Sequence, residues 1–113
     1  MMNLDNFFQP LLLCGAIFIL AGLLMIIFTP KKINYLYGYR TARSMKNQKN
    51  WDFSQLYSSK MLILFGVGYI ILSPLKMLVT LSESQENILA MGIVILSLPF
   101  LFLIVEKAIK KNE

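Results

Sequence analysis

The chain has 113 residues, of which 57% are apolar and 15% are charged, and its net charge is +5. Soluble domains carry about 45–50% apolar and about 25% charged residues, so this composition predicts a single domain, residues 1–113, that lies in lipid. With no histidine and one cysteine, Cys14, the sequence excludes an internal disulfide and lacks the usual metal ligand and the commonest general base. We therefore expect no metal site and no cofactor.

Three apolar stretches are candidates for membrane spans. Residues 11–28 and residues 88–105 each contain no charge, and a helix needs about 20 apolar residues to cross about 30 Å of hydrocarbon. The second stretch, residues 61–75, is shorter, and Pro74 interrupts it near its end. It gains the missing length if its helix begins near residues 47–50. The pattern predicts an all-α membrane protein with three transmembrane helices and, between the first two, an interfacial cytoplasmic loop and a short helix.

Small residues are placed where these spans could approach closely. Gly15 and Gly22 are seven residues apart on one face of the first span, Gly66 lies in the second and Gly92 in the third. Glycine lets helix backbones come near each other in lipid. Because three spans enclose little interior, we also expect a homodimer.

Positive charge is concentrated on two segments. The loop over residues 29–60 has seven Lys or Arg and a single acid, and three lysines follow the third span, whereas the connector at residues 82–87 has two glutamates and no cation. Cations are retained on the cytoplasmic side. We expect the N-terminus outside and the 29–60 loop and the C-terminus in the cytoplasm. Lys76, close to the outer connector, is expected to extend to the outer headgroups.

The net charge of +5 has a simple explanation in this topology. Anionic headgroups on the inner leaflet attract basic segments next to a membrane span. Nothing in the sequence resembles a nucleic-acid-binding module. We therefore expect contact with anionic membrane lipid and no nucleic acid.

The 29–60 loop contains a polar and aromatic segment that a simple connector does not need. Its alternating tyrosines are Tyr35, Tyr37 and Tyr39. They fit either an aromatic belt at the headgroups or the wall of a ligand site. Trp51 fits the same two roles. Gly38 can adopt a positive φ or allow a close backbone approach, because it has no Cβ.

Two arginines of this segment are suited to anions. Arg40 and Arg43 are three residues apart, and each has a planar fork of donors that matches phosphate or carboxylate. Near the inner leaflet they could hold a lipid phosphate or a peptide carboxylate, or they could pair with Asp52, the only acid in the loop. Thr41 or Ser44 can cap a short helical turn through its hydroxyl group.

The same segment carries a motif with fixed spacing over 18 residues, formed by Asn34, Gly38, Tyr39, Arg40, Thr41, Ser44, Met45, Asn47 and Trp51. This motif resembles that of the SdpI family of bacterial membrane proteins. The resemblance implies a location in the bacterial cell (inner) membrane, immunity to a secreted toxin that acts on membranes, and signalling by holding a transcriptional repressor at the membrane. The family's namesake has additional spans before its motif domain, whereas this sequence looks like the motif domain alone.

Several functions are compatible with these features. The resemblance implies a toxin-resistance protein with a peptide toxin as partner. The alternative is a protein that binds lipid-headgroup phosphate, or assists transport, through the Arg40–Arg43 loop. An assembly subunit that only packs with a partner also stays open. An enzyme is not expected, because the spans contain no paired carboxylates and Cys14 has no neighbouring base. The candidate ligand-binding residues are Asn34, Tyr35, Gly38, Tyr39, Arg40, Thr41, Arg43, Ser44, Asn47, Trp51 and Asp52.

Overall fold

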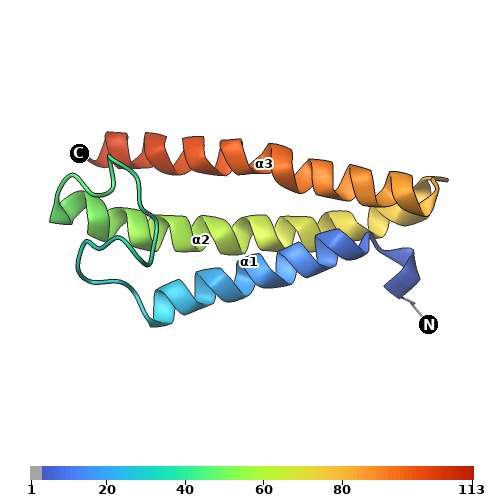
Figure 1. Cartoon of the computed structure of the whole chain (residues 1–113), viewed down its shortest axis with the longest axis horizontal. Coiled ribbons are helices and arrows are strands. Elements are labelled where there is room, and N and C mark those ends of the chain that lie inside the picture. The colour runs from blue at the N-terminus through green and yellow to red at the C-terminus, as the bar shows by residue number, and fades with distance from the viewer. Residues whose placement is uncertain (1–3) are drawn as a thin grey trace.

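The computed structural model describes residues 4–113 of the chain as a bundle of long helices (Figure 1). In chain order the elements are a 3₁₀ helix η1 (Leu4–Asn6), α1 (Gln9–Ile27), α2 (Gln48–Leu72), a 3₁₀ helix η2 (Ser73–Leu78) and α3 (Glu83–Asn112). The described part of the chain contains no strand. All three α-helices are long and apolar enough to cross a membrane. The prediction of an all-α protein with three transmembrane helices is confirmed.

The ends of α1 lie close to the predicted ends of the first span. Pro10 is in the first helical turn, where the N–H that it lacks would have no helical partner. At the other end, the Thr29 hydroxyl donates a hydrogen bond to the carbonyl oxygen of Met25 at 2.8 Å. Pro30 follows and disfavours helix in the residue before it. The 29–60 loop therefore begins at a well-defined point.

Helix α2 begins in the loop and continues into the membrane. The Asn47 side chain caps it by accepting a hydrogen bond from the backbone N–H of Asn50 at 2.8 Å. It ends at Leu72, because Pro74 cannot continue an α-helix, and the chain goes on as η2. The prediction that the second span gains length from the preceding segment is confirmed. The short helical element expected in the loop is a single turn, in which the Met45 N–H donates to the Thr41 carbonyl at 3.0 Å.

Helix α3 is longer than the apolar stretch that predicted it. Ser82 and Gln85 form a capping box, with each side chain accepting from the backbone N–H of the other. The helix then runs for 30 residues to Asn112, or about 45 Å at 1.5 Å per residue. That length exceeds the hydrocarbon thickness of about 30 Å. Its polar ends therefore extend beyond the apolar region, and the C-terminal end brings Glu106 alongside the loop.

Helices α1 and α2 are in backbone contact at their glycines. A Cβ atom at Gly15 would lie 2.7 Å from the carbonyl oxygen of Gly66, and one at Gly66 would lie 2.6 Å from that of Gly15. A Cβ atom at Gly22 would lie 2.7 Å from the carbonyl oxygen of Ser59. The predicted close approach is confirmed for these helices. It is wrong for Gly92, where a Cβ atom would meet nothing within 4 Å.

Helix α3 is held by side chains instead. In the middle of the bundle the Tyr69 and Ser97 hydroxyls are hydrogen-bonded to each other, and the Tyr69 ring packs edge-to-face on Phe18 of α1, with centroids 5.2 Å apart. At the end away from the loop, Lys76 Nζ lies 3.1 Å from a carboxylate oxygen of Glu86. Lys76 therefore has an acidic partner within the chain, and its extension to the outer headgroups stays a prediction.

Candidate functional site

In the structure the loop covers residues 28–47, because α2 already begins at Gln48. It folds back onto the first turns of α2, and Trp51 of α2 is central to this contact. Its side chain is 0% exposed, and its Nε1–H donates to the carbonyl oxygen of Pro30 at 2.7 Å. A headgroup anchor must reach the interface, so that interpretation of Trp51 is wrong. Instead, Trp51 fixes the start of the loop against α2.

Gln55 holds the backbone of the loop at Tyr39. Its side-chain oxygen accepts from the Tyr39 N–H and its amide nitrogen donates to the Tyr39 carbonyl, both at 2.8 Å. Gly38, directly before, has φ +105°, and a Cβ atom there would collide with the Gln55 side-chain oxygen and lie 2.8 Å from Pro30 Cγ. The expected positive φ and close approach at Gly38 are both confirmed, because the buried Gln55 amide occupies the space of a side chain.

A reciprocal pair of hydroxyl groups shapes the turn that follows. Ser44 Oγ accepts from the Thr41 N–H at 2.7 Å, and Thr41 Oγ1 accepts from the Ser44 N–H at 3.1 Å. Ser44 Oγ also lies 3.1 Å from the carbonyl oxygen of Tyr39, to which it can donate. Ser44 is fully buried. The predicted capped turn is therefore present, and both hydroxyls serve the loop itself.

Two asparagines of the motif also serve the loop. Asn34 Oδ1 accepts from the backbone N–H groups of Leu36 and Tyr37, at 2.9 and 2.8 Å, which forms a tight local turn. Asn47 caps α2. Tyr37 attaches the loop to α1, since its hydroxyl donates to the Leu24 carbonyl at 3.3 Å.

The loop meets α3 through a small network of polar side chains. The Tyr39 hydroxyl donates to Glu106 Oε1 at 2.8 Å, and Arg43 Nε lies 3.3 Å from Glu106 Oε2. Arg43 Nη1 is 3.8 Å from a carboxylate oxygen of Glu113. The Asn50 amide donates to the Arg43 carbonyl and to Glu113, each at 2.9 Å. Both acids that face this network thus come from the C-terminal part of the chain, Glu106 from α3 and Glu113 from the residue directly after it.

The surroundings of Tyr39 and Glu113, at the two ends of this network, favour one charge state for each side chain. Burial raises the pKa of the Tyr39 phenol well above its usual range, and the neighbouring Glu106 carboxylate adds to the rise. Tyr39 is therefore a neutral donor at physiological pH. The hydrogen bond from Asn50 lowers the pKa of the Glu113 carboxyl, which favours its charged form.

Asp52 does not neutralise the arginines. It lies on the exposed side of α2, where its carboxylate accepts from the Gln48 side chain at 2.7 Å. Arg43 pairs with Glu106 and Glu113 instead. The alternative of an Arg43–Asp52 pair is wrong, because the loop turns Arg43 toward α3. Sequence reasoning missed both glutamates, which follow the apolar stretch of α3 and were not expected to reach the loop.

Arg40 is a motif side chain that takes no part in this network. It is exposed and forms no hydrogen bond or ion pair with any residue that the structure describes. Tyr35 is also presented outward, with 82% of its surface exposed. Most of the candidate residues discussed above therefore stabilise the fold of the loop, whereas Arg40 and Tyr35 have exposed side chains. Asn50 and Gln55 belong to the first group although neither was a predicted site residue; polar residues at the start of a predicted span were the available signal.

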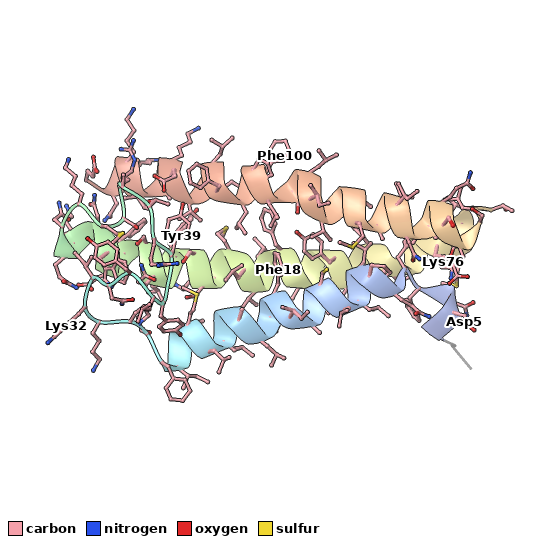
Figure 2. All side chains as sticks on the ribbon, in the orientation of Figure 1. Asp5, Phe18, Lys32, Tyr39, Lys76 and Phe100 are labelled. Carbon is pink, nitrogen blue, oxygen red and sulfur yellow. The ribbon has the colours of Figure 1, made fainter. Side chains whose placement is uncertain are left out.

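A cavity of about 180 Å³ lies beneath the loop, between the three helices. It is lined by Met25 of α1, Ser58 and Leu62 of α2, Leu101 and Val105 of α3, and Gly38 and Tyr39 of the loop. Figure 2 shows Tyr39 at the loop end of the bundle, with Lys32 at the same end and Lys76 and Asp5 at the opposite end. The cavity and the displayed Arg40 therefore lie at the same end of the molecule.

Comparison with known proteins finds similarity over most of the chain. Residues 31–105 match the family model described as the SdpI/YfhL protein family. A curated relative, "Uncharacterized protein YfhL" of Bacillus subtilis (strain 168), is 35% identical over 96 residues, which are 85% of this chain and 82% of that protein. No solved structure matches the chain. The family match includes the loop, α2 and most of α3.

Proposed function

The chain belongs to the SdpI/YfhL protein family, and we propose that it is a membrane immunity protein that protects a bacterial cell against a membrane-active peptide toxin. The resemblance of its motif to that of the SdpI family supports this role. The observation that carries the proposal furthest is the exposure of Arg40. Among the motif side chains it is the charged one that the loop displays without a partner in the described structure.

The construction of the loop supports recognition at this residue. Gln55 and Ser44 fix the backbone at Tyr39, immediately before Arg40. A side chain that follows a fixed backbone loses less conformational freedom when it binds, which favours affinity. A guanidinium group binds carboxylate or phosphate through two parallel hydrogen bonds. In our proposal Arg40 supplies this contact to the toxin, or to the membrane component on which the toxin acts.

This role is one of binding without catalysis. A catalytic set drawn from residues 29–60 would join Asp52 to Ser44, Ser54 or Lys46. The Ser44 hydroxyl is occupied by the loop backbone, and Ser54 Oγ donates to the Trp51 carbonyl at 2.9 Å. Asp52 accepts from Gln48. A nucleophile needs a base within hydrogen-bonding reach, and these contacts favour a structural use of both serines.

We further propose that the protein lies in the bacterial inner membrane with the loop and the end of α3 in the cytoplasm. The seven cations at residues 29–60 support this orientation. Cysteine accessibility in whole cells tests it, in a Cys14→Ser background. Ser84→Cys should react with a membrane-impermeant maleimide, whereas Lys46→Cys should react only after the cells are opened. The reverse pattern would contradict the orientation.

Survival of a sensitive bacterium during exposure to membrane-active peptide toxins tests the immunity proposal. Wild type should protect, and Arg40→Ala should lose protection by about tenfold or more, since a hydrogen bond to a charged group contributes about 1.5–3 kcal/mol. Lys49→Ala is the matched control, because it removes another exposed cation of the same segment. Membrane abundance must be equal. Full protection by Arg40→Ala would rule out a role for this side chain, and an absence of protection by wild type would count against immunity.

A further inference from the structure

We infer that the loop end of the bundle binds one anionic phospholipid, with the lipid phosphate at Arg40 and part of an acyl chain in the cavity beneath Tyr39. The site deepens the form of the proposed function in which Arg40 contacts a membrane component, and it concerns a ligand that is held whether or not a toxin is present. Its test measures bound lipid and not cell survival. The two proposals can therefore fail separately.

The lining of the cavity selects an apolar occupant. Met25, Leu62 and Leu101 contribute hydrocarbon surface from three different helices. The two lining side chains with polar groups are already hydrogen-bonded, Ser58 to the Gln55 carbonyl at 3.2 Å and Tyr39 to Glu106 at 2.8 Å. A polar ligand would find no free side-chain partner there, and burial of an unpaired polar group is unfavourable.

The size of the cavity fits a portion of an acyl chain. Its volume is about 180 Å³, slightly larger than the ~150 Å³ apolar cavity that accepts benzene in a soluble protein. Several methylene groups fill such a space, while the rest of the lipid stays on the surface of the bundle. Complete enclosure of a lipid is not required for binding at this position.

The depth of the cavity matches a lipid of the same leaflet as the loop. Met25 lies in the last turn of α1, and Val105 directly precedes Glu106, the residue at which α3 becomes polar. The cavity therefore lies just inside the apolar zone. A lipid with its phosphate at the level of the loop would have its acyl chains at this depth.

The charges of the segment that covers the cavity favour an anionic headgroup. Arg40 follows directly on Gly38 and Tyr39, both of which line the cavity, and it is exposed and unpaired within the described residues. The neighbouring acids do not compete for it, because Glu106 and Glu113 are engaged by Arg43. The remaining exposed cations of residues 29–60 include Lys31, Lys32, Lys46 and Lys49. This excess of positive charge distinguishes an anionic phospholipid from a zwitterionic one.

Native mass spectrometry of the purified full chain in detergent tests the site. After removal of endogenous lipid, wild type should bind one phosphatidylglycerol at least tenfold more tightly than phosphatidylcholine. Arg40→Ala should reduce phosphatidylglycerol binding to the level of phosphatidylcholine. Lys49→Ala should keep the preference. Equal binding of both lipids by wild type would overturn the headgroup assignment, as would an unchanged preference in Arg40→Ala.

The acyl-chain position has its own pair of variants. Leu101→Trp fills the cavity and should weaken binding of both lipids by about tenfold. Leu103→Trp is the matched control, because Leu103 is on the same helix but is 59% exposed, and it does not line the cavity. Glycerol phosphate, which has the phosphate but no acyl chain, should not compete with phosphatidylglycerol. Wild-type affinity in a folded Leu101→Trp variant, or effective competition by glycerol phosphate, would overturn the use of the cavity.

A second measurement uses the unmodified chain and so does not depend on folding of a variant. Phosphatidylglycerol with a photoreactive diazirine in its acyl chain should label residues that line the cavity, such as Leu62 and Leu101. Labelling confined to other parts of the bundle would contradict the site. Displacement of all bound lipid by a peptide toxin, with the same residues then labelled by a photoreactive toxin, would assign the cavity to the peptide instead.

Discussion

The seam between α1 and α2 and the attachment of α3 are built on different principles. At the seam, Gly15 and Gly66 bring two backbones into direct contact, so that no larger residue fits. Helix α3 packs through buried apolar side chains such as Val94 and Val105. Its polar contacts are at Ser97 in the middle and at Glu86 and Glu106 toward its two ends. Backbone contact fixes the distance between α1 and α2, whereas side-chain contacts position α3 and leave space between the helices. The cavity at the loop end lies in such a space.

The loop is attached closely to the pair of helices α1 and α2, and it also contacts α3. Trp51 and Gln55 anchor it to α2, Tyr37 attaches it to α1, and further hydrogen bonds lie within the loop itself. Tyr39 and Arg43 then reach across to α3. The motif therefore joins the rigid pair of helices to the more separately held one. We infer that the loop helps to set the position of the C-terminal end of α3, together with the buried side chains of Val105 and Ile109.

The seam offers the largest expected effect. Gly66→Leu should destabilise the bundle by about 3 kcal/mol, the upper end of the range for overpacking, because its Cβ atom alone would lie 2.6 Å from the Gly15 carbonyl oxygen. Gly68→Leu is the control, since a Cβ atom at Gly68 meets nothing within 4 Å. Reversible unfolding in mixed detergent micelles measures both. Equal stability of the two variants would show that the seam does not depend on close approach.

Loss of the loop anchor should have a smaller effect, confined to one end. Gln55→Ala leaves the Tyr39 N–H without its buried partner and removes one of the two donors to the Tyr39 carbonyl, which should destabilise the docked loop by about 2 kcal/mol. Limited trypsin digestion should then cut after Arg40 or Arg43 much faster than in wild type, while the bundle stays folded. Leu56→Ala, at the neighbouring exposed position of α2, is the matched control. An unchanged cleavage rate in Gln55→Ala would mean that Trp51 suffices to hold the loop.

These regions also differ in how far the sequence predicts them. The three spans, the start of α2 near residue 47 and the end of the second span at Pro74 follow from apolar length, capping residues and proline chemistry. The glycine seam is predicted because a repeat on one helix face has few other uses in lipid. Such features depend on local sequence, which is why they can be predicted without a structure.

The partners within the site could not be predicted in the same way. Asp52 is near the arginines in sequence, but α2 carries it to the exposed side, whereas Glu106 lies 63 residues after Arg43 and reaches it through the fold. Trp51 is a residue type that is typical of headgroup anchors, but here it is buried and its Nε1–H donates to the carbonyl oxygen of Pro30. Hydrogen bonds between distant segments depend on tertiary structure, and residue type alone does not select among possible partners.

The contact between the loop and α3 can be tested at Tyr39. Tyr39→Phe removes the hydroxyl that donates to Glu106 and should destabilise the docked end of α3 by about 1 kcal/mol, because Arg43 still pairs with that carboxylate. Hydrogen exchange of the amides near Glu106 measures the loss, and Tyr35→Phe, at an exposed position, is the control.

The pH dependence of the same variant follows from the raised pKa of Tyr39. A group whose pKa is higher in the folded state contributes stability that is complete below its unfolded pKa, about 10 for tyrosine, and declines above it. The difference between wild type and Tyr39→Phe should therefore be the same at pH 6 and pH 9. A difference that disappears between these pH values would mean that the phenol ionises there, against the environment that burial and Glu106 create.

The smallest effect is expected at Asp52. This position distinguishes neutralisation of the arginines by α2 from neutralisation by α3. If Asp52 neutralised the arginines, Asp52→Asn would free them and destabilise the loop. The structure gives Asp52 one exposed partner, Gln48, and an asparagine oxygen can accept the same hydrogen bond. We expect Asp52→Asn to change stability by less than about 0.5 kcal/mol. Glu106→Gln, in contrast, should weaken the attachment of α3, because it removes the charge that faces Arg43 at 3.3 Å. A larger loss in Asp52→Asn than in Glu106→Gln would mean that the loop is neutralised from α2, and that α3 is positioned by helix packing alone.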